Sequence, residues 1–76
     1  MQNGDSMTRL VAHLPDNHTL WNCVNCACVP YTYIQDATGL EIMSMPRTDA
    51  EYMIRTFYDR IGLVPDESII RIARIS

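Results

Sequence analysis

Three cysteines lie close together in this 76-residue chain, and no other stretch concentrates residues that could do chemistry. They are Cys23, Cys26 and Cys28; His18 precedes them by five residues, and His13 lies a little further back. Thiolates and imidazole nitrogens are the usual ligands of zinc, and a structural zinc site takes four of them. The cluster therefore raises the hypothesis of a zinc site formed by His18 and the three cysteines.

Three features of the sequence weigh against zinc. Cys23 and Cys26 form one Cys-x-x-Cys pair, but the chain has no second such pair and no closely spaced histidine pair. No glycine follows Cys26 to help the chain turn around a metal. If the segment is one continuous strand, Cys26 and Cys28 face one way and Cys23 faces the other. We therefore predict no cofactor and expect reduced cysteines that pack as small apolar side chains. Zinc remains the alternative, and a disulfide, which would leave one thiol over, is a third interpretation.

The remaining polar residues do not form a catalytic pattern. A cysteine nucleophile with His13 as its base has no supporting local motif. The acids Asp49 and Glu51 are explained by a helix start, where negative charge is favourable. The three glycines are scattered along the chain, so they cannot form a phosphate-binding loop. We predict that the protein is not an enzyme.

Length and composition indicate one small globular domain. With 47% hydrophobic and 20% charged residues, the chain is too apolar to be disordered. We expect a polar tail at 1–6 and a compact domain at 7–76. The first residues lack the pattern of a signal peptide, so we expect a cytoplasmic protein with reduced thiols. No run of about 18 apolar residues is present to span a membrane.

Four segments have the composition and alternation of β-strands. These segments are 8–14, 19–29, 31–34 and 40–45. In the first, Leu10, Ala12 and Leu14 are expected on one buried face. Turn residues follow at 15–18, and Gly39 in the segment 36–39 suits a hairpin loop.

One helix is strongly indicated after the fourth strand. The segment 48–51 reads as a capping box, with Thr48 as the N-cap and Glu51 reaching back to it. An apolar stripe at helical spacing then continues to Ile61, and Gly62 is the expected terminating residue. The stripe consists of Ala50, Met53, Ile54, Phe57 and Ile61.

The end of the chain, 68–75, is apolar on both faces in its first half and is interpreted as an interior strand. The element order is then β-β-β-β-α-β. We predict an α+β fold in which one amphipathic helix packs on one face of a small, mainly antiparallel sheet of four or five strands. The helix would join two strands through a right-handed crossover.

A single helix leaves one face of such a sheet available for contact. We expect that face to carry exposed aromatic and acidic side chains, which suit a non-enzymatic protein-binding module. The expected contact residues are Trp21, Tyr31, Tyr33, Asp36 and Glu41. The partner would be a larger protein or protein complex, because a net charge of −3 disfavours binding to nucleic acid or to a membrane surface.

Size and acidic composition are typical of accessory proteins of phages and mobile elements, including anti-CRISPR proteins that block a host defence complex. This is an analogy of profile and involves no shared motif. Two alternatives stay open besides it: a zinc-stabilised domain using the cysteine cluster, and a homodimer paired through an edge strand. A small DNA-binding regulator is a fourth hypothesis, disfavoured by the acidic balance. The chain is therefore expected to be a monomer or a homodimer.

Overall fold

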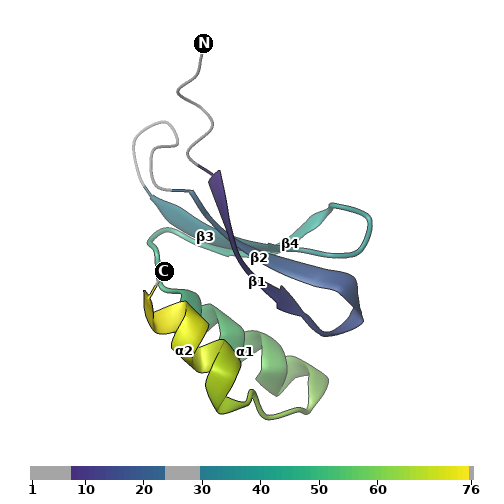
Figure 1. Ribbon diagram of the computed structural model, residues 1–76. Helices are drawn as coiled ribbons and strands as arrows, with labels where there is room; N and C mark the ends of the chain where they lie inside the picture. The colour runs from purple at the N-terminus through teal and green to yellow at the C-terminus, as the bar shows by residue number, and fades with distance from the viewer. Residues whose placement is uncertain (1–7, 24–29, 76) are drawn as a thin grey trace.

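The computed structural model describes residues 8–23 and 30–75 and shows a four-stranded antiparallel sheet with two helices. The strands are β1 (Thr8–Leu14), β2 (His18–Cys23), β3 (Tyr31–Gln35) and β4 (Glu41–Met45). Each strand pairs with the next along the chain, so the sheet is a simple meander (Figure 1). The predicted tail at 1–6 and the segment 24–29 of the second predicted strand lie outside the described residues.

Two tight connections join the strands at one end of the sheet. The turn η2 (Pro15–Asn17) places Asp16 and Asn17 at positive φ angles of 58° and 61°, which these residue types tolerate well. In the β3–β4 hairpin, a carboxylate oxygen of Asp36 accepts hydrogen bonds from the backbone N–H groups of Thr38 and Leu40. Gly39 follows at a φ of 90°, as the predicted hairpin loop requires.

The first strand contains an irregularity that the sequence reading missed. Leu10 pairs with Trp21, whereas Ala12 pairs with Leu20, so Val11 is an extra residue in β1. A bulge of this kind moves the following side chains to the opposite face. Ala12 and Leu14 are therefore buried, but Leu10 lies on the other face and is 42% exposed. The prediction that Leu10 shares one buried face with Ala12 and Leu14 is therefore wrong.

The helix α1 (Ala50–Ile61) confirms the predicted apolar stripe, of which all but Ile61 is buried. Gly62 follows in the left-handed conformation, as expected. The predicted cap is wrong by one residue, because Asp49, not Thr48, accepts a hydrogen bond from the backbone N–H of Tyr52. The Glu51 carboxylate does not close a capping box; it binds Arg55 and Arg74.

The predicted last strand is a helix, α2 (Glu67–Ile75). The Asp66 carboxylate begins it by accepting hydrogen bonds from the Ile69 backbone and the Ser68 hydroxyl. The buried residues Ile69, Ile70 and Ala73 follow a helical spacing, while Ile72 and Ile75 are exposed. The fifth strand and the right-handed crossover are therefore absent from the described part of the chain, and its element order is β-β-β-β-α-α.

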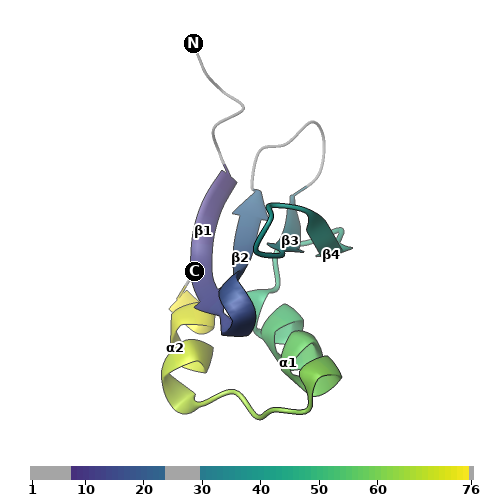
Figure 2. The same ribbon diagram turned by 90° about the vertical axis from the view of Figure 1, so that its right-hand side faces the viewer.

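Both helices pack on the same face of the sheet (Figure 2). α1 lies under β2 and β3, and α2 lies under β1. Between the two layers is one core, which draws residues from the sheet and from both helices. Its members include Leu14, Leu20, Ile34, Ile54 and Ile70. No helix in the described ranges has the length and apolar character needed to cross a membrane.

One buried polar cluster ties the sheet to the start of α1. The Thr32 hydroxyl lies 2.9 Å from Asn22 Oδ1 and 2.9 Å from the carbonyl oxygen of Arg47, and it accepts a hydrogen bond from the backbone N–H of Asp49 at 3.0 Å. Both Thr32 and Asn22 are buried. These bonds fix the chain that leaves β4 against the middle of the sheet, which sets where α1 begins.

Candidate functional site

The face of the sheet away from the helices carries a row of three aromatic rings. Leu20 and Ile34 point into the core, so the adjacent residues Trp21 and Tyr33 point to the opposite face. Tyr31 shares that face with Tyr33, two positions away on β3. No described helix covers this side of the sheet (Figure 1).

The three rings are held against one another in a fixed order. The centroids of Tyr31 and Tyr33 are 5.2 Å apart, with an interplanar angle of 29°. Tyr33 and Trp21 are nearly parallel at 6.3 Å. The indole N–H of Trp21 donates a hydrogen bond to the Thr19 hydroxyl at 2.9 Å, which fixes the ring orientation. A row that is already ordered loses little side-chain entropy on binding.

Tyr33, the middle ring of the row, is buried between the other two rings. Tyr33 is only 8% exposed, so the expectation that it is an exposed contact residue is wrong. Burial raises the pKa of its hydroxyl; a hydrogen bond with the Thr8 side chain opposes that rise, and the nearby Tyr31 and Glu41 add to it. The phenol is therefore neutral at physiological pH. Trp21 and Tyr31 are half-buried and present the accessible ring surface.

The two predicted acidic contact residues behave differently from each other. Asp36 is occupied within its own hairpin, and the hydrogen bond from the Thr38 hydroxyl, together with backbone bonds from Leu40 and Thr38, lowers its pKa. Its carboxylate is therefore committed to shaping the turn. Glu41, at the start of β4, is exposed and close enough to Tyr33 for its charge to act on the phenol. Glu41 is the better candidate for a contact with a partner.

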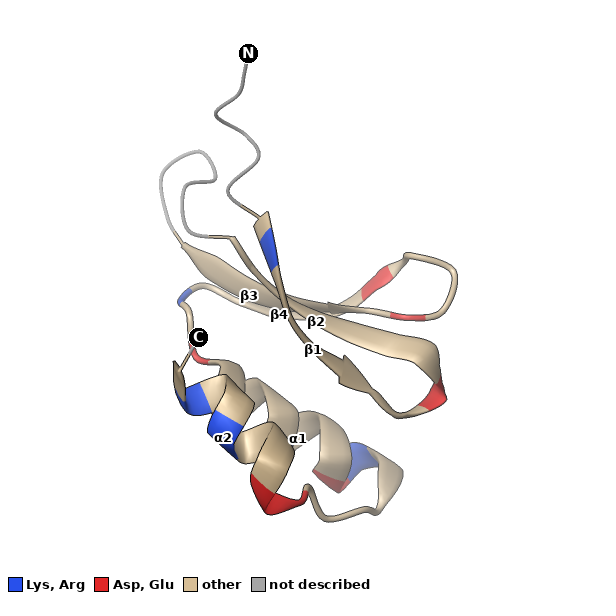
Figure 3. Ribbon diagram, viewed as in Figure 1, with Lys and Arg blue, Asp and Glu red and all other residues tan. Residues whose placement is uncertain are grey.

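Charge is distributed unevenly between the two layers. Among the described residues of the sheet and its turns, Arg9 is the one basic residue, against the three acids Asp16, Asp36 and Glu41. All three acids lie at the end of the sheet where the two tight connections are (Figure 3). The helical half carries five arginines and five acids, so its charges balance. The excess negative charge of the described chain therefore lies at the sheet.

A shallow hollow lies beside the aromatic row. It has a volume of about 280 Å³ and is lined by Tyr31, Ser44, Met45 and Pro46. Methionine side chains adapt their shape readily, which suits a surface that accepts an apolar side chain from a partner. The hollow extends the candidate site from β3 to the edge strand β4.

Within the described residues, the structure does not bring the ligands of the hypothetical zinc site together. His18 and Cys23 stand at opposite ends of β2, which at a rise of about 3.3 Å per residue separates them by roughly 16 Å. One metal ion cannot bind both. Cys26 and Cys28 lie outside the described residues, and within the described ranges no group of three potential ligands could hold a metal ion.

Each of these two residues has a local role instead. Cys23 is fully buried and is disulfide-bonded, which differs from the expected reduced thiol. His18 is half-buried, and its ring centroid lies 5.0 Å from that of Phe57. Its Nδ1 is 3.0 Å from the Pro15 carbonyl oxygen, so it closes the β1–β2 turn against α1. His13, the other histidine, is exposed on β1.

Sequence reasoning missed Leu10 as a neighbour of the aromatic row. The bulge in β1 places it beside Trp21 on the helix-free face. An alternating strand pattern gives no sign of one extra residue, so only the register of the paired strands reveals it.

Comparison with protein-family models, with curated proteins and with solved structures found no match to this chain.

Proposed function

We propose that this protein is a non-enzymatic module that binds a larger protein through the helix-free face of its sheet. The observation that carries the proposal is the stacked row of Tyr31, Tyr33 and Trp21 on that face. Aromatic side chains dominate the binding energy of protein interfaces when they are rigid and centrally placed. The buried ring of Tyr33 lies between the other two rings, and a hydrogen bond to Thr19 holds Trp21, so the row is organised before a partner arrives.

The charge around the row favours a protein partner with basic side chains. Nucleic-acid binding relies on lysine and arginine to neutralise phosphates. The described sheet offers Arg9 alone for that purpose, and its turn end is acidic. An arginine on the partner can stack on Trp21 or Tyr31 and also be attracted by Glu41. The proposed partner surface is therefore apolar with arginines at its border.

We further propose a steric mode of action, in which the bound domain covers a working surface of a host complex in the cytoplasm. The support is the profile of the chain: small, acidic and without a catalytic constellation among its described residues. Accessory proteins of phages and mobile elements, anti-CRISPR proteins among them, share that profile. A rigid sheet face needs no conformational change to block a groove, which agrees with a mode of action by simple coverage.

A comparative pull-down tests the proposal. The bait is this protein, incubated with a lysate of the cells in which it is naturally made. One variant combines Trp21→Ala with Tyr31→Ala, and a second carries Glu41→Arg. The matched control is Tyr52→Ala, because Tyr52 is an aromatic residue that is 55% exposed on α1, away from the proposed face.

We expect a protein that is retained by the wild type and by Tyr52→Ala to be lost with the double aromatic variant and reduced with Glu41→Arg. Circular dichroism verifies that each variant is folded. Retention of the same proteins by the wild type and the folded double variant would show that the aromatic face is not the binding surface.

A further inference from the structure

We propose that the cavity between β1, α1 and α2 binds a small organic amine, whose ammonium group is held by Asp66 and whose apolar body packs between the strand and α2. The cavity lies on the helical side of the sheet, away from the aromatic row. The inference therefore does not depend on the proposed function.

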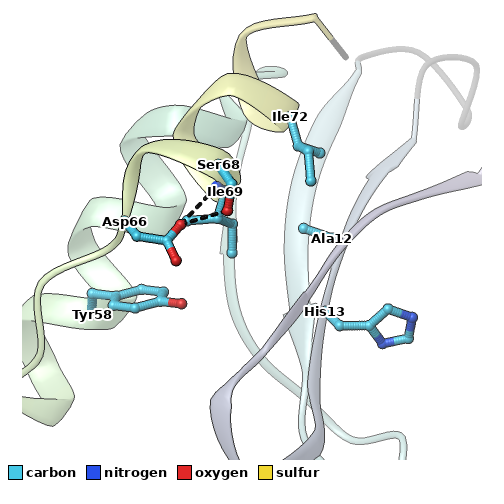
Figure 4. Close-up of a pocket in the computed structure, with 7 residues that line it drawn as sticks. All are labelled: Ala12, His13, Tyr58, Asp66, Ser68, Ile69 and Ile72. Carbon is cyan, nitrogen blue, oxygen red and sulfur yellow. Dashed lines mark hydrogen bonds between the residues drawn. The ribbon is translucent and has the colours of Figure 1, made fainter.

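Three elements form the walls of this cavity, which has a volume of about 370 Å³ (Figure 4). Ala12 of β1 lies opposite Ile69 and Ile72 of α2, and Tyr58 of α1 forms the third wall. Small-molecule sites commonly combine mostly apolar walls with a few polar groups that fix the orientation of the ligand. The apolar walls of this cavity can hold the body of such a ligand.

Asp66 is the acid that lines this cavity. One of its carboxylate oxygens accepts hydrogen bonds from the Ser68 hydroxyl at 2.7 Å and from the Ile69 backbone N–H at 3.1 Å. These bonds lower the pKa of the carboxyl, so it is ionised at neutral pH. Figure 4 shows its second oxygen turned toward Tyr58, and no arginine of the described chain forms an ion pair with it.

The side chain of Tyr58 adds a second attraction for a cation. Its hydroxyl points toward β1 and has no hydrogen-bond partner within the described residues (Figure 4). Burial raises the pKa of this hydroxyl, and the charge of Asp66 adds to the rise, so the two side chains are close enough to interact. A cation placed between them is attracted by the carboxylate and by the electron-rich ring, and its N–H groups can donate to the phenol oxygen.

The lining residues favour an amine over other classes of ligand. An anion would be repelled by Asp66, and no lysine or arginine lines the cavity to offset that repulsion. The His13 ring points away from Asp66 and does not supply a cation to it (Figure 4). A metal ion needs several oxygen ligands, and the described residues offer no group of three. A neutral ligand would gain nothing from the carboxylate.

The exposure of the lining residues indicates how the ligand is oriented. Asp66 is exposed, whereas Ala12 and Ile69 are buried. The ammonium group is therefore expected at the rim, where it keeps part of its contact with water and avoids the cost of burying a charge. The apolar body points inward and also covers Ile72, which is 43% exposed without a ligand.

Titration with phenethylamine, followed through the backbone amide signals in NMR spectra, tests the inference. We expect saturable shifts of the signals of Ala12, Ile69 and Ile72. The matched probe is phenethyl alcohol, in which a neutral hydroxyl replaces the amino group. We expect the alcohol to bind at least about fivefold more weakly than the amine, because it lacks the charge that Asp66 and the Tyr58 ring attract.

Two substitutions in the cavity and one control separate charge from shape. Asp66→Asn retains an oxygen that can cap α2 and removes the charge, so it is expected to bind both probes equally. Ile72→Lys gives the cavity an ammonium group of its own and is expected to abolish the shifts caused by the amine. Asp59→Asn, at an exposed position of α1 outside the cavity, is expected to keep the preference of the wild type. The dispersion of the amide signals verifies that each variant is folded.

Three outcomes would overturn the inference: no saturable shift at the lining residues with phenethylamine, equal binding of the amine and the alcohol by the wild type, or an Asp66→Asn variant that still prefers the amine. A lysine-containing peptide serves as a further probe, because the lysine side chain also ends in an ammonium group. If it binds in the cavity more tightly than phenethylamine, the ligand is a side chain of a partner protein, and the assignment to a free small molecule is wrong.

Discussion

Thr32 is the residue on which the polar contacts of the core converge. Its single hydroxyl proton can be donated to Asn22 Oδ1 or to the Arg47 carbonyl oxygen, but not to both at once. The same oxygen accepts the bond from the Asp49 backbone N–H. A side chain chosen by its shape alone could not satisfy these groups, of which the Asn22 contact is buried and the other two are partly buried.

Replacing Thr32 with valine is expected to destabilise the fold by roughly 1–3 kcal/mol, since it leaves buried polar groups without a partner while preserving side-chain shape. Thr32→Ser retains the hydroxyl and removes only a methyl group, so its cost is expected to be near 1 kcal/mol. Urea denaturation of the two variants measures the difference. A valine variant as stable as the wild type, beside a clearly destabilised serine variant, would show that packing, and not hydrogen bonding, is what Thr32 supplies.

The sequence does not reveal this role. Thr32 sits in the run 31–34, where any β-branched residue is favoured by strand propensity alone. Its partners lie 10, 15 and 17 positions away along the chain, so no local pattern connects them. By contrast, the function of Gly62 was predictable, because its positive φ is demanded by the local geometry of a helix end.

At the scale of single elements, acidic side chains fix the turns and helix starts. Asp36 shapes the β3–β4 hairpin, and Asp66 caps α2. Glu51 joins the two helices, because its carboxylate binds Arg55 on α1 and Arg74 on α2. Each of these carboxylates is a stronger hydrogen-bond acceptor when it is ionised, and Glu51 forms its ion pairs only in that state.

Their protonation is expected to weaken the fold in acid. The pKa is lowered for Asp36 by the bond from the Thr38 hydroxyl, for Glu51 by Arg74 and then Arg55, and for Asp66 by the Ser68 hydroxyl. A pKa lower in the folded than in the unfolded state stabilises the fold above the unfolded value of about 4. That contribution is lost as pH falls through the folded value. We therefore expect a steady urea midpoint from neutral pH to about pH 5 and a decline below about pH 4.

The substitution Asp66→Asn isolates one of these contributions. Asparagine retains an oxygen that can cap α2 but does not titrate, so the variant is expected to lose less stability between neutral and acidic pH than the wild type. Asp59→Asn, at an exposed position on α1, serves as the control. An Asp66→Asn variant that loses as much stability on acidification as the wild type would contradict this assignment.

The two helices show why one element was predictable and the other was not. α1 has twelve residues, a clear apolar stripe and a glycine terminator, and these signals agree with one another. α2 has only nine residues and five apolar positions, four of them isoleucine, a residue that favours strands. The spacing of Ile69, Ile70 and Ala73 is in fact helical, but the strand preference of the isoleucines outweighed it in the sequence-based interpretation.

At the scale of the whole molecule, the core between the two layers and the outer face of the sheet have different roles. The helices and the inner face of the sheet supply stability, and the outer face is left with aromatic rings and an acidic end. The α+β class and a mainly antiparallel sheet were predictable from the spacing of turns, but the order of the strands was not. The bulge at Val11, which brings Leu10 to the aromatic face, was not.

A native mass spectrum, compared with the mass of the denatured and reduced chain, tests the state of the cysteines. Since Cys23 is disulfide-bonded, we expect the unreduced chain to be lighter by two hydrogens and to carry no zinc. The zinc hypothesis predicts the opposite: one metal ion per chain and the full reduced mass. The sample is protein purified without reductant or added metal. As a control, the same spectrum is recorded after zinc is added, and we expect no bound zinc.

The packing of α2 under β1 has a consequence for how the protein is made. β1 is the first of the described elements to leave the ribosome and α2 is the last, yet Ala12 and Leu14 share one core with Ile69 and Ile70. During translation, the inner face of β1 is therefore not fully covered until almost the entire domain has been synthesised. Until then part of the apolar inner face of β1 remains uncovered on the nascent chain.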